Sequence, residues 1–159
     1  MQKITTHLWF DDQAEEAARF YTSVFPNSRI VEVNHYGEGE PGKPGGAVTV
    51  VTFELDGQQY LALDGGPMFK FSEAISLYVD CATQEEADEL WATLTADGGQ
   101  ESQCGWLKDK FGLSWQIIPK EATDLLSDPD KARAGRAMQA MMGMQKLDVQ
   151  ALRDAADGS

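Results

Sequence analysis

The feature that most constrains the fold of this 159-residue chain is a repeated order of predicted elements. Apolar residues recur with helical spacing between Gln13 and Phe25, and again between Thr83 and Gly98. A strand-like run ending in an acidic residue precedes each helix, and β-rich segments follow each helix. The order strand, helix, strand and hairpin thus occurs twice, which predicts two βαβββ modules.

Local signals at helix ends and turns support this repeat. Asp12 and Thr83 are expected to cap the two helices, each with a glutamate three residues later that can return a hydrogen bond. Asp56-Gly57 predicts a tight hairpin turn, and Phe111-Gly112 stands in the same relative place in the second half. Short apolar runs are ambiguous alone, so the agreement of caps and turns carries the prediction.

We expect one α+β structural domain of three parts: a first module over residues 1–66, a second over residues 67–119 and a C-terminal helical extension over residues 120–159. A helix should cover one face of each sheet, so the two free faces are expected to curve round one cavity. The Gly- and Pro-rich segment from Glu38 to Gly46 has no helix after it. It predicts a mobile loop at the cavity mouth and not a phosphate-binding loop.

The pattern beyond Pro119 is helical. Asp128 is expected to cap a helix that begins at Pro129, and Asp148 to cap a last short helix. One side of the longer helix is predicted to carry an apolar stripe: Ala134, Met138, Met141 and Met142. Such a stripe favours packing, within the chain or between subunits, over a cofactor site.

Charge and composition exclude several classes of partner. The chain has 26 acidic and 13 basic residues and a formal net charge of −13 at pH 7, so nucleic acid and anionic membrane surfaces should be repelled. The sequence has no long apolar run and no cationic leader at Met1 to Phe10, which predicts a soluble, cytoplasmic protein. Cys81 and Cys104 are too few for a disulfide framework, so reduced thiols are expected.

Three segments of the chain resemble a known family. The runs HLWFDDQAEEAARFYTSVFPNSRI, LALDGGPMFKFSEAISLYVD and CGWLKDKFGLSWQIIP are similar to recurring segments of PhnB-like proteins. These proteins form a branch of the vicinal-oxygen-chelate (glyoxalase/bleomycin resistance/dihydroxybiphenyl dioxygenase) superfamily and often carry the label 3-demethylubiquinone-9 3-methyltransferase domain. The resemblance implies a paired βαβββ fold, usually homodimeric, whose sheets enclose a small-molecule site.

The resemblance also implies where a metal would bind. Metal-dependent relatives commonly supply His or Gln from the first strand and Glu from the last strand. Alternation places His7 and Trp9 on the strand face away from the helix, and Gln116 stands four residues after Gly112. A Gln carbonyl binds a hard metal weakly and cannot act as a general base. His7 and Gln116 are therefore weak metal candidates.

The other ligand positions favour a degraded or absent metal site. The equivalent place in the first module falls near Leu61 or Ala62, and the fifth strand offers Ala74 or Ser76. Asp64 and His35 could complete a site only by folding in. A catalytic zinc or manganese site needs about three good protein ligands. Any divalent metal is expected to bind weakly, and no tightly bound cofactor is expected.

Five side chains are expected to line the small-molecule pocket: His7, Trp9, Ser76, Tyr78 and Gln116. Trp115 should face away from Gln116. The aromatic members fit core packing equally well. Cys104 is a weaker candidate for a nucleophile, because no Cys-His arrangement is legible.

The sequence thus predicts a small-molecule-binding protein or enzyme whose substrate and catalytic residues stay open. Two alternatives remain, a divergent metal-dependent lyase, isomerase or dioxygenase, and non-catalytic sequestration of a drug or metabolite. True methyl transfer is not expected, because no glycine-rich turn joins a strand to a helix in an alternating α/β pattern.

Overall fold

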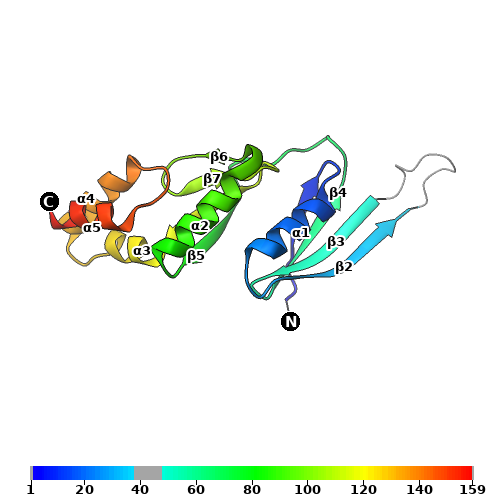
Figure 1. Ribbon diagram of the computed structural model, residues 1–159, viewed down its shortest axis with the longest axis horizontal. Helices are drawn as coiled ribbons and strands as arrows, with labels where there is room; N and C mark the ends of the chain where they lie inside the picture. The colour runs from blue at the N-terminus through cyan, green and yellow to red at the C-terminus, as the bar shows by residue number, and fades with distance from the viewer. Residues whose placement is uncertain (1, 38–47, 159) are drawn as a thin grey trace. The chain divides into compact units, whose positions relative to one another are not determined.

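The computed structural model describes residues 2–37 and 48–158, and the chain divides into two compact units, Met1–Phe71 and Ser72–Ser159 (Figure 1). The segment predicted as a loop, Glu38 to Gly46, lies outside the described residues. Within the described part of the chain, no helix is long and apolar enough to cross a bilayer.

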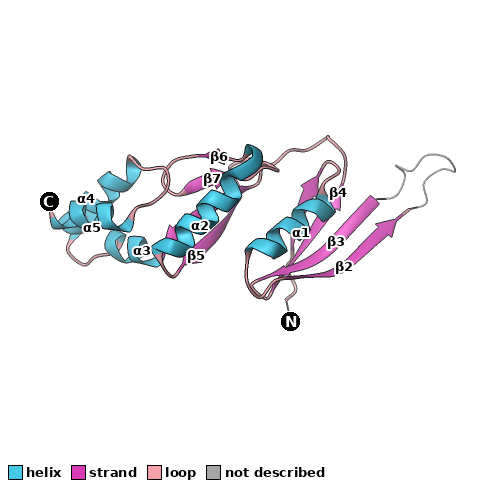
Figure 2. Ribbon diagram, in the orientation of Figure 1, coloured by secondary structure: helices cyan, strands magenta, loops and turns pink. Residues whose placement is uncertain are grey.

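The first unit is a four-stranded mixed sheet with one helix (Figure 2). Its elements are β1 (Thr6–Phe10), α1 (Ala14–Val24), β2 (Arg29–Tyr36), β3 (Val48–Leu55) and β4 (Gln58–Asp64). The strand order is β1-β4-β3-β2. β1 runs parallel to β4, and the other neighbours are antiparallel.

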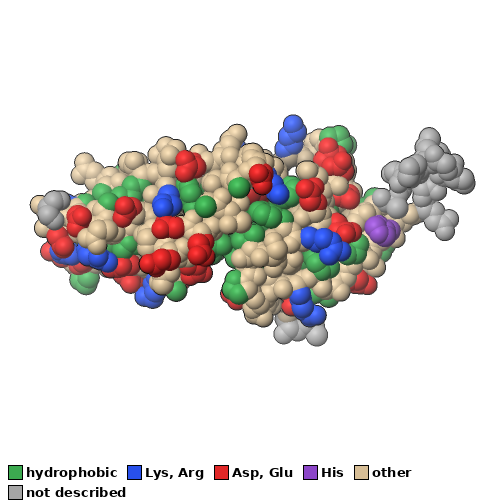
Figure 3. Space-filling model, in the orientation of Figure 1, with side chains coloured by type: hydrophobic (Ala, Val, Ile, Leu, Met, Phe, Trp, Pro, Cys, Tyr) green, Lys and Arg blue, Asp and Glu red, His purple; other side chains and the backbone are tan. Residues whose placement is uncertain are grey.

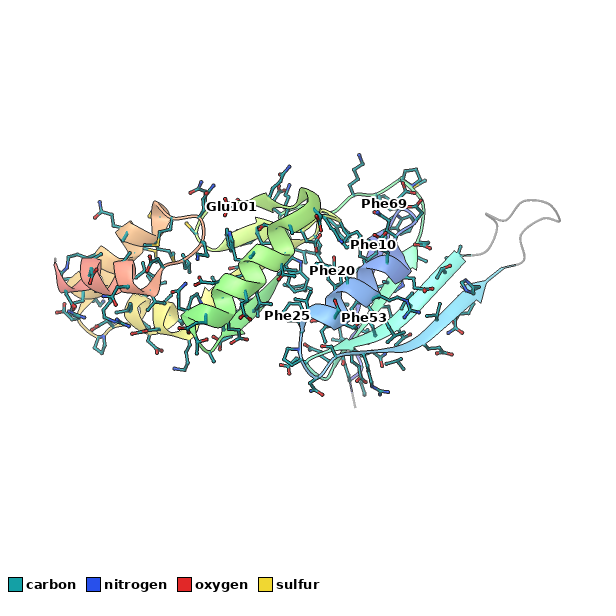
Figure 4. The ribbon with its side chains drawn as sticks, viewed as in Figure 1. Phe10, Phe20, Phe25, Phe53, Phe69 and Glu101 are labelled. Atoms are coloured by element: carbon teal, nitrogen blue, oxygen red, sulfur yellow. The ribbon has the colours of Figure 1, made fainter. Side chains whose placement is uncertain are left out.

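One face of this sheet forms the core of the first unit. Helix α1 turns four buried side chains inward: Ala14, Ala17, Ala18 and Tyr21. They meet the alternate strand residues whose side chains are also buried, including Leu8, Phe10, Phe53 and Ala62. Figure 4 shows Phe10 and Phe53 beside α1. Because strand side chains alternate, the intervening residues of β1, β3 and β4 lie on the free face of the sheet.

The second unit repeats this design and adds three helices. Its sheet is built from β5 (Ser76–Cys81), β6 (Gln100–Glu101), β7 (Trp106–Lys108) and β8 (Ser114–Pro119), and α2 (Gln84–Thr95) covers one face. A short 3-10 turn, η1 (Ala96–Gly98), follows α2. The order β5-β8-β7-β6, with β5 parallel to β8, matches the first unit. The predicted α+β class with two βαβββ modules is confirmed.

The C-terminal helices α3 (Lys120–Leu126), α4 (Lys131–Met142) and α5 (Val149–Asp157) pack around a small apolar cluster. Its buried members are Ile118, Ala122, Leu147 and Leu152. The side chains of the predicted apolar stripe on α4 differ in their packing within the chain. Met141 packs on the cluster, whereas Met138 and Met142 are 43% and 65% exposed. Ala137 is the buried residue of this helix, and a contact between subunits, the other role expected for the stripe, stays a prediction.

Gln84 at the start of α2 anchors the C-terminal extension. Its Nε2 donates to the carbonyl oxygen of Leu147 at 2.9 Å, and its Oε1 accepts from the amide of Val149 at 2.8 Å. Val149 is the first residue of α5, so its amide has no acceptor within that helix. One side chain thus satisfies two backbone groups outside its own helix.

Replacing Gln84 with alanine is expected to speed hydrogen exchange of the Val149 amide by about tenfold or more, because the lost bonds are each worth about 1 kcal/mol. Gln145→Ala, at an exposed position of the same segment, is the matched control. Exchange followed by NMR checks the prediction. Equal protection of Val149 in both variants would show that Gln84 does not hold the segment.

Two of the four predicted helix caps are confirmed. Thr83 caps α2 by accepting from the amide of Glu86, and Asp148 caps α5 by accepting from Ala151, as predicted. Asp12 does not cap α1. The N-cap residue is Gln13, and Asp64 at the end of β4 accepts from the Ala14 amide at 2.8 Å.

The predicted start of α4 is also wrong. The cap is Asp130, whose Oδ1 accepts from Ala132, and the helix begins at Lys131 instead of Pro129. Asp128 instead accepts from the Asp130 amide and forms an ion pair with Arg133. Asp130 thus caps the helix, and Asp128 orders the turn that precedes it.

The two hairpins differ in their turns. Asp56 and Gly57 both have positive φ, 50° and 76°, as a tight two-residue hairpin turn requires. The second hairpin is wider than predicted, because β7 ends at Lys108 and β8 begins at Ser114. Gly112 does adopt a positive φ of 90°. The buried side chain of Asp109 organises the longer connection.

Candidate functional site

The free face of the first sheet is mostly apolar, with His7 at its edge strand. The register places His7 beside Leu61, which in turn lies beside Thr52. The next row contains Trp9, Leu63 and Val50. Leu8 and Phe10 are buried on the other side, so the predicted orientation of His7 and Trp9 is the one observed.

Trp9 is held in a fixed position on this face. Its Nε1 donates to the carbonyl oxygen of Gly66 at 2.9 Å, and the Phe69 ring meets it edge-on with centroids 5.0 Å apart. A Cβ on Gly65 would lie 2.4 Å from the Trp9 ring, so glycine permits the close approach of the backbone. A rigid half-buried indole with a satisfied N–H offers a flat apolar surface to a ligand.

His7 is exposed and has no second metal ligand next to it in the sheet. Its lateral neighbour is Leu61, whose side chain cannot coordinate a metal. Asp64 is engaged by the Ala14 amide, and His35 lies within 3.0 Å of the Thr49 hydroxyl, out on β2. In residues 2–37 and 48–158, no group of three or more His, Cys, Asp or Glu could hold a metal ion.

The free face of the second sheet brings together three of the predicted residues. Gln116 pairs with Tyr78 on β5 and with Trp106 on β7, so these side chains form one row. Gln116 Nε2 donates to the Ser76 hydroxyl oxygen at 2.9 Å. Tyr78 is 54% exposed. Together with Ser76, the row offers an amide, two hydroxyls and two aromatic rings, which suits recognition of a small organic molecule.

Sequence reasoning missed two further polar residues on this face. Ser114 and Lys108 pair with each other across β8 and β7, and Ser114 also pairs with Ser76. Alternation along β8 could have placed Ser114 with Gln116, since they are two residues apart. The ion pair between Lys108 and Glu73 has no local sequence signal.

Trp115 faces away from Gln116, as predicted, and a buried aspartate holds it in place. Asp109 is 2% exposed, and its Oδ2 accepts from Trp115 Nε1 at 2.8 Å. Its Oδ1 accepts from the amides of Phe111 and Leu113. These bonds fix the β7–β8 connection and thereby the start of β8, where the polar side chains of the free face begin.

The two cysteines differ in their surroundings. Cys81 is fully buried, and burial raises the pKa of its thiol to about 12, with smaller contributions from Glu86 and Asp80. Cys104 is partly exposed, with a left-handed φ of 59°, and its amide donates to the Met144 carbonyl. Cys81 is therefore a neutral packing residue at neutral pH.

In the native protein, a disulfide reagent at pH 7.5 is expected to modify Cys104 and leave Cys81 protected. The Cys81 thiol is inaccessible, and its raised pKa keeps it protonated. Cys104→Ser should remove nearly all native-state reaction, whereas in denaturant the variant should release one equivalent. Rapid native reaction of Cys104→Ser would contradict this assignment.

Comparisons with known proteins identify the family. Residues 2–118 match the model of the family described as 3-demethylubiquinone-9 3-methyltransferase. The PhnB protein from Bacillus cereus is 40% identical, over 74% of this chain and 99% of that chain, with a TM-score of 0.65. This chain belongs to the PhnB-like family. The membership predicted from the three sequence segments is thus confirmed.

Other solved structures resemble this PhnB-like chain at lower identity. A protein from Pseudomonas aeruginosa is 16% identical, over 76% of this chain and 98% of that chain, with a TM-score of 0.63, and shares the fold. A glyoxylase/bleomycin resistance protein/dioxygenase domain from Frankia sp. EAN1pec is 18% identical, over 72% and 94% of the two chains, with a TM-score of 0.46. A search of curated proteins found no match.

The structure thus groups the five predicted pocket residues into two sets. His7 and Trp9 share the free face of the first sheet, and Ser76, Tyr78 and Gln116 share the free face of the second sheet. Their role in lining a pocket, and the shared cavity expected from the duplication, stay predictions.

Proposed function

We propose that this PhnB-like chain binds a small organic molecule through polar and aromatic side chains on the free faces of its sheets. The observation that carries the proposal is the row of Tyr78, Gln116 and Trp106, with Ser76 hydrogen-bonded to Gln116. On the first sheet, His7 and the fixed ring of Trp9 supply similar groups. An apolar surface with a few oriented hydrogen-bonding groups is what small ligands require.

The donor set does not fit a tightly bound catalytic metal. His7 has Leu61 as its lateral neighbour. Gln116 offers only a neutral carbonyl oxygen, while its Nε2 donates to Ser76. A catalytic site needs about three good ligands and an open position. We therefore propose that any divalent ion binds weakly.

The family description does not by itself assign methyl transfer. The connections from β1 to α1 and from β5 to α2 contain no glycine, so neither provides the glycine-rich turn of a common nucleotide-type site. The groups around Gln116 can orient a ligand but include neither an adjacent nucleophilic thiol nor a carboxylate pair. Binding, with or without a slow reaction, is the function that these groups support best.

We further propose a cytoplasmic homodimer, as the resemblance to PhnB-like proteins implies. Met138 and Met142 on α4 are exposed, and we place them in the proposed contact. Nucleic acid is not among the proposed partners, given the net charge of −13. Sedimentation at micromolar concentration tests the dimer, and a monomeric mass would contradict it.

Thermal-shift screening of chelator-treated protein against a library of small organic molecules tests the proposed function. A ligand that binds the native state raises the unfolding temperature by mass action. We expect saturable hits whose affinity falls at least tenfold in His7→Ala or Gln116→Ala. Hits that bind both variants as tightly as the wild type would contradict the assignment of these faces.

A metal panel on the same protein separates the alternatives. Zinc, manganese, nickel, cobalt and iron(II) are expected to give no selective stabilisation that His7→Ala abolishes. A selective rise lost in that variant would instead support a metal-dependent enzyme. A library hit chemically altered after incubation would support catalysis and exclude pure sequestration.

A further inference from the structure

The free face of β8 carries a buried hydroxyl without a hydrogen-bond partner. Ser114 is 1% exposed, and its Oγ makes no hydrogen bond within the described part of the chain. The register places Ser76 on one side of Ser114 and Lys108 on the other. Buried polar groups in native proteins are nearly always satisfied, so an unpaired hydroxyl points to a missing partner.

Two polar contacts made by long side chains extend beside Ser114. Gln116 reaches diagonally from β8 to Ser76 on β5. Lys108 on β7 forms an ion pair with Glu73, which precedes β5, so this pair reaches across the start of β8 where Ser114 lies. The side chains of Lys108 and Glu73 are 34% and 64% exposed. An exposed ion pair of this kind is weak and can open at little cost.

We propose that Lys108, Ser114 and Ser76 form a subsite for an oxyanion group of the ligand, in which the Glu73 carboxylate occupies the place of that group. The inference rests on the proposed function and deepens it by naming the ligand class. When Glu73 swings outward, the Lys108 ammonium can donate to the ligand oxygens. Ser114 can donate its unused O–H, and Ser76, whose oxygen accepts from Gln116, can donate its own.

The charges near the subsite favour an anion despite the acidity of the chain. Figure 3 shows acidic side chains spread over the visible surface of the second unit. Charges farther away than the Debye length of about 8 Å at physiological salt are largely screened. On the same sheet face the nearest acidic strand residue is Asp80, which lies at the far end of β5 beside Ile118. Asp109 is turned to the other side, toward Trp115.

The hydrogen bond from Lys108 lowers the pKa of Glu73, and the charge of Lys108 lowers it further, so Glu73 is ionised at neutral pH. The carboxylate of Glu73 and that of a ligand therefore compete for one ammonium group. Removing the Glu73 charge should strengthen anion binding, which a purely structural ion pair would not do.

NMR titration of the chelator-treated full chain tests this subsite, with sodium acetate and sodium phosphate as probes and sodium chloride at matched ionic strength as the control. The readout is the shift of the Ser114 and Gln116 amides. Glu73→Gln is expected to tighten acetate binding about two- to fivefold, the range expected for an exposed ion pair. Lys108→Met should abolish binding, and Ser114→Ala should weaken it about tenfold.

Matched controls are available in the same unit. Glu85→Gln and Lys120→Met make the same charge changes at exposed positions of α2 and α3, and Ser102→Ala removes an exposed hydroxyl. These variants should bind acetate as the wild type does. Ser114→Ala without ligand should unfold at the wild-type temperature or above it, because removing the unpaired hydroxyl breaks no hydrogen bond.

The titration results distinguish an oxyanion subsite from a structural ion pair. Unchanged acetate affinity in Glu73→Gln or Ser114→Ala, or equal shifts with chloride, would overturn the subsite. A response to phosphate alone, with the same variant pattern, would support the oxyanion subsite and assign it to a phosphate-type group instead of a carboxylate.

Different results would contradict the oxyanion subsite and the proposed function. Library ligands whose affinity depends on His7 or Gln116 but not on Glu73, Lys108 and Ser114 would overturn the subsite and leave the proposed function standing. Acetate binding with the expected variant pattern, but no library ligand, would leave the subsite standing and contradict the proposed function.

Discussion

Replacing Asp109 with alanine is expected to lower the free energy of unfolding by about 3–4 kcal/mol, a large share of the ~5–15 kcal/mol typical of a folded domain. The carboxylate is buried and accepts from Trp115 Nε1 and from the amides of Phe111 and Leu113. Alanine would leave these donors without their acceptor inside the protein. Urea denaturation followed by circular dichroism and tryptophan fluorescence measures the loss.

Asp109→Asn separates the individual bonds. The amide oxygen can still accept from Phe111 and Leu113, but its NH₂ group would face the Trp115 N–H, so two donors would meet. We expect Asp109→Asn to lose roughly half as much stability as Asp109→Ala. In a Trp115→Phe background, Asp109→Asn should cost about 1 kcal/mol less than in the wild type, because the opposing N–H is absent. Wild-type stability of Asp109→Ala would contradict the role of Asp109 in the β7–β8 connection.

Replacing Gly65 with alanine is expected to cost about 2–3 kcal/mol and to release Trp9. The new Cβ would lie 2.4–2.7 Å from three atoms of the indole ring, which is far too close for a rigid ring to accommodate. Trp9 would have to turn, losing its bond to the Gly66 carbonyl and its contact with Phe69. Urea denaturation and the emission spectrum of the indole together report both changes.

Two comparisons isolate this clash. Gly135→Ala on α4 places a Cβ in open space and should stabilise the protein by about 0.5–1 kcal/mol through helix propensity. In a Trp9→Leu background, where the indole ring is absent, adding Gly65→Ala should cost less stability than it does in the wild type. If Gly65→Ala left both stability and emission unchanged, Trp9 would not be fixed by this glycine.

The elements predictable from sequence are those whose signals are local. Thr83 and Glu86 lie three residues apart in one turn, so the cap of α2 could be read directly. Alternation along β1 predicts His7 and Trp9 on the free face, because the apolar residues next to them, Leu8 and Phe10, face the helix. The resemblance of three segments to PhnB-like proteins then implies that these elements form two βαβββ modules.

Contacts between distant residues could not be predicted in this way. Asp64 lies 50 positions from the Ala14 amide that it accepts from, whereas the local sequence pattern favours Asp12 as the cap of α1. The role of Asp109 depends on the closed β7–β8 connection, and the ion pair of Lys108 with Glu73 depends on β8 lying between β5 and β7. Such side-chain partners are selected by sheet register and not by sequence spacing.

The central claim is that the free sheet faces bind a small molecule without a tightly bound metal, and NMR mapping of a library ligand on chelator-treated protein tests it most directly. We expect amide shifts concentrated at His7 and Trp9 or at Tyr78 and Gln116, unchanged when zinc or manganese is added. Shifts confined to the C-terminal helices, or binding that appears only with added metal, would contradict it.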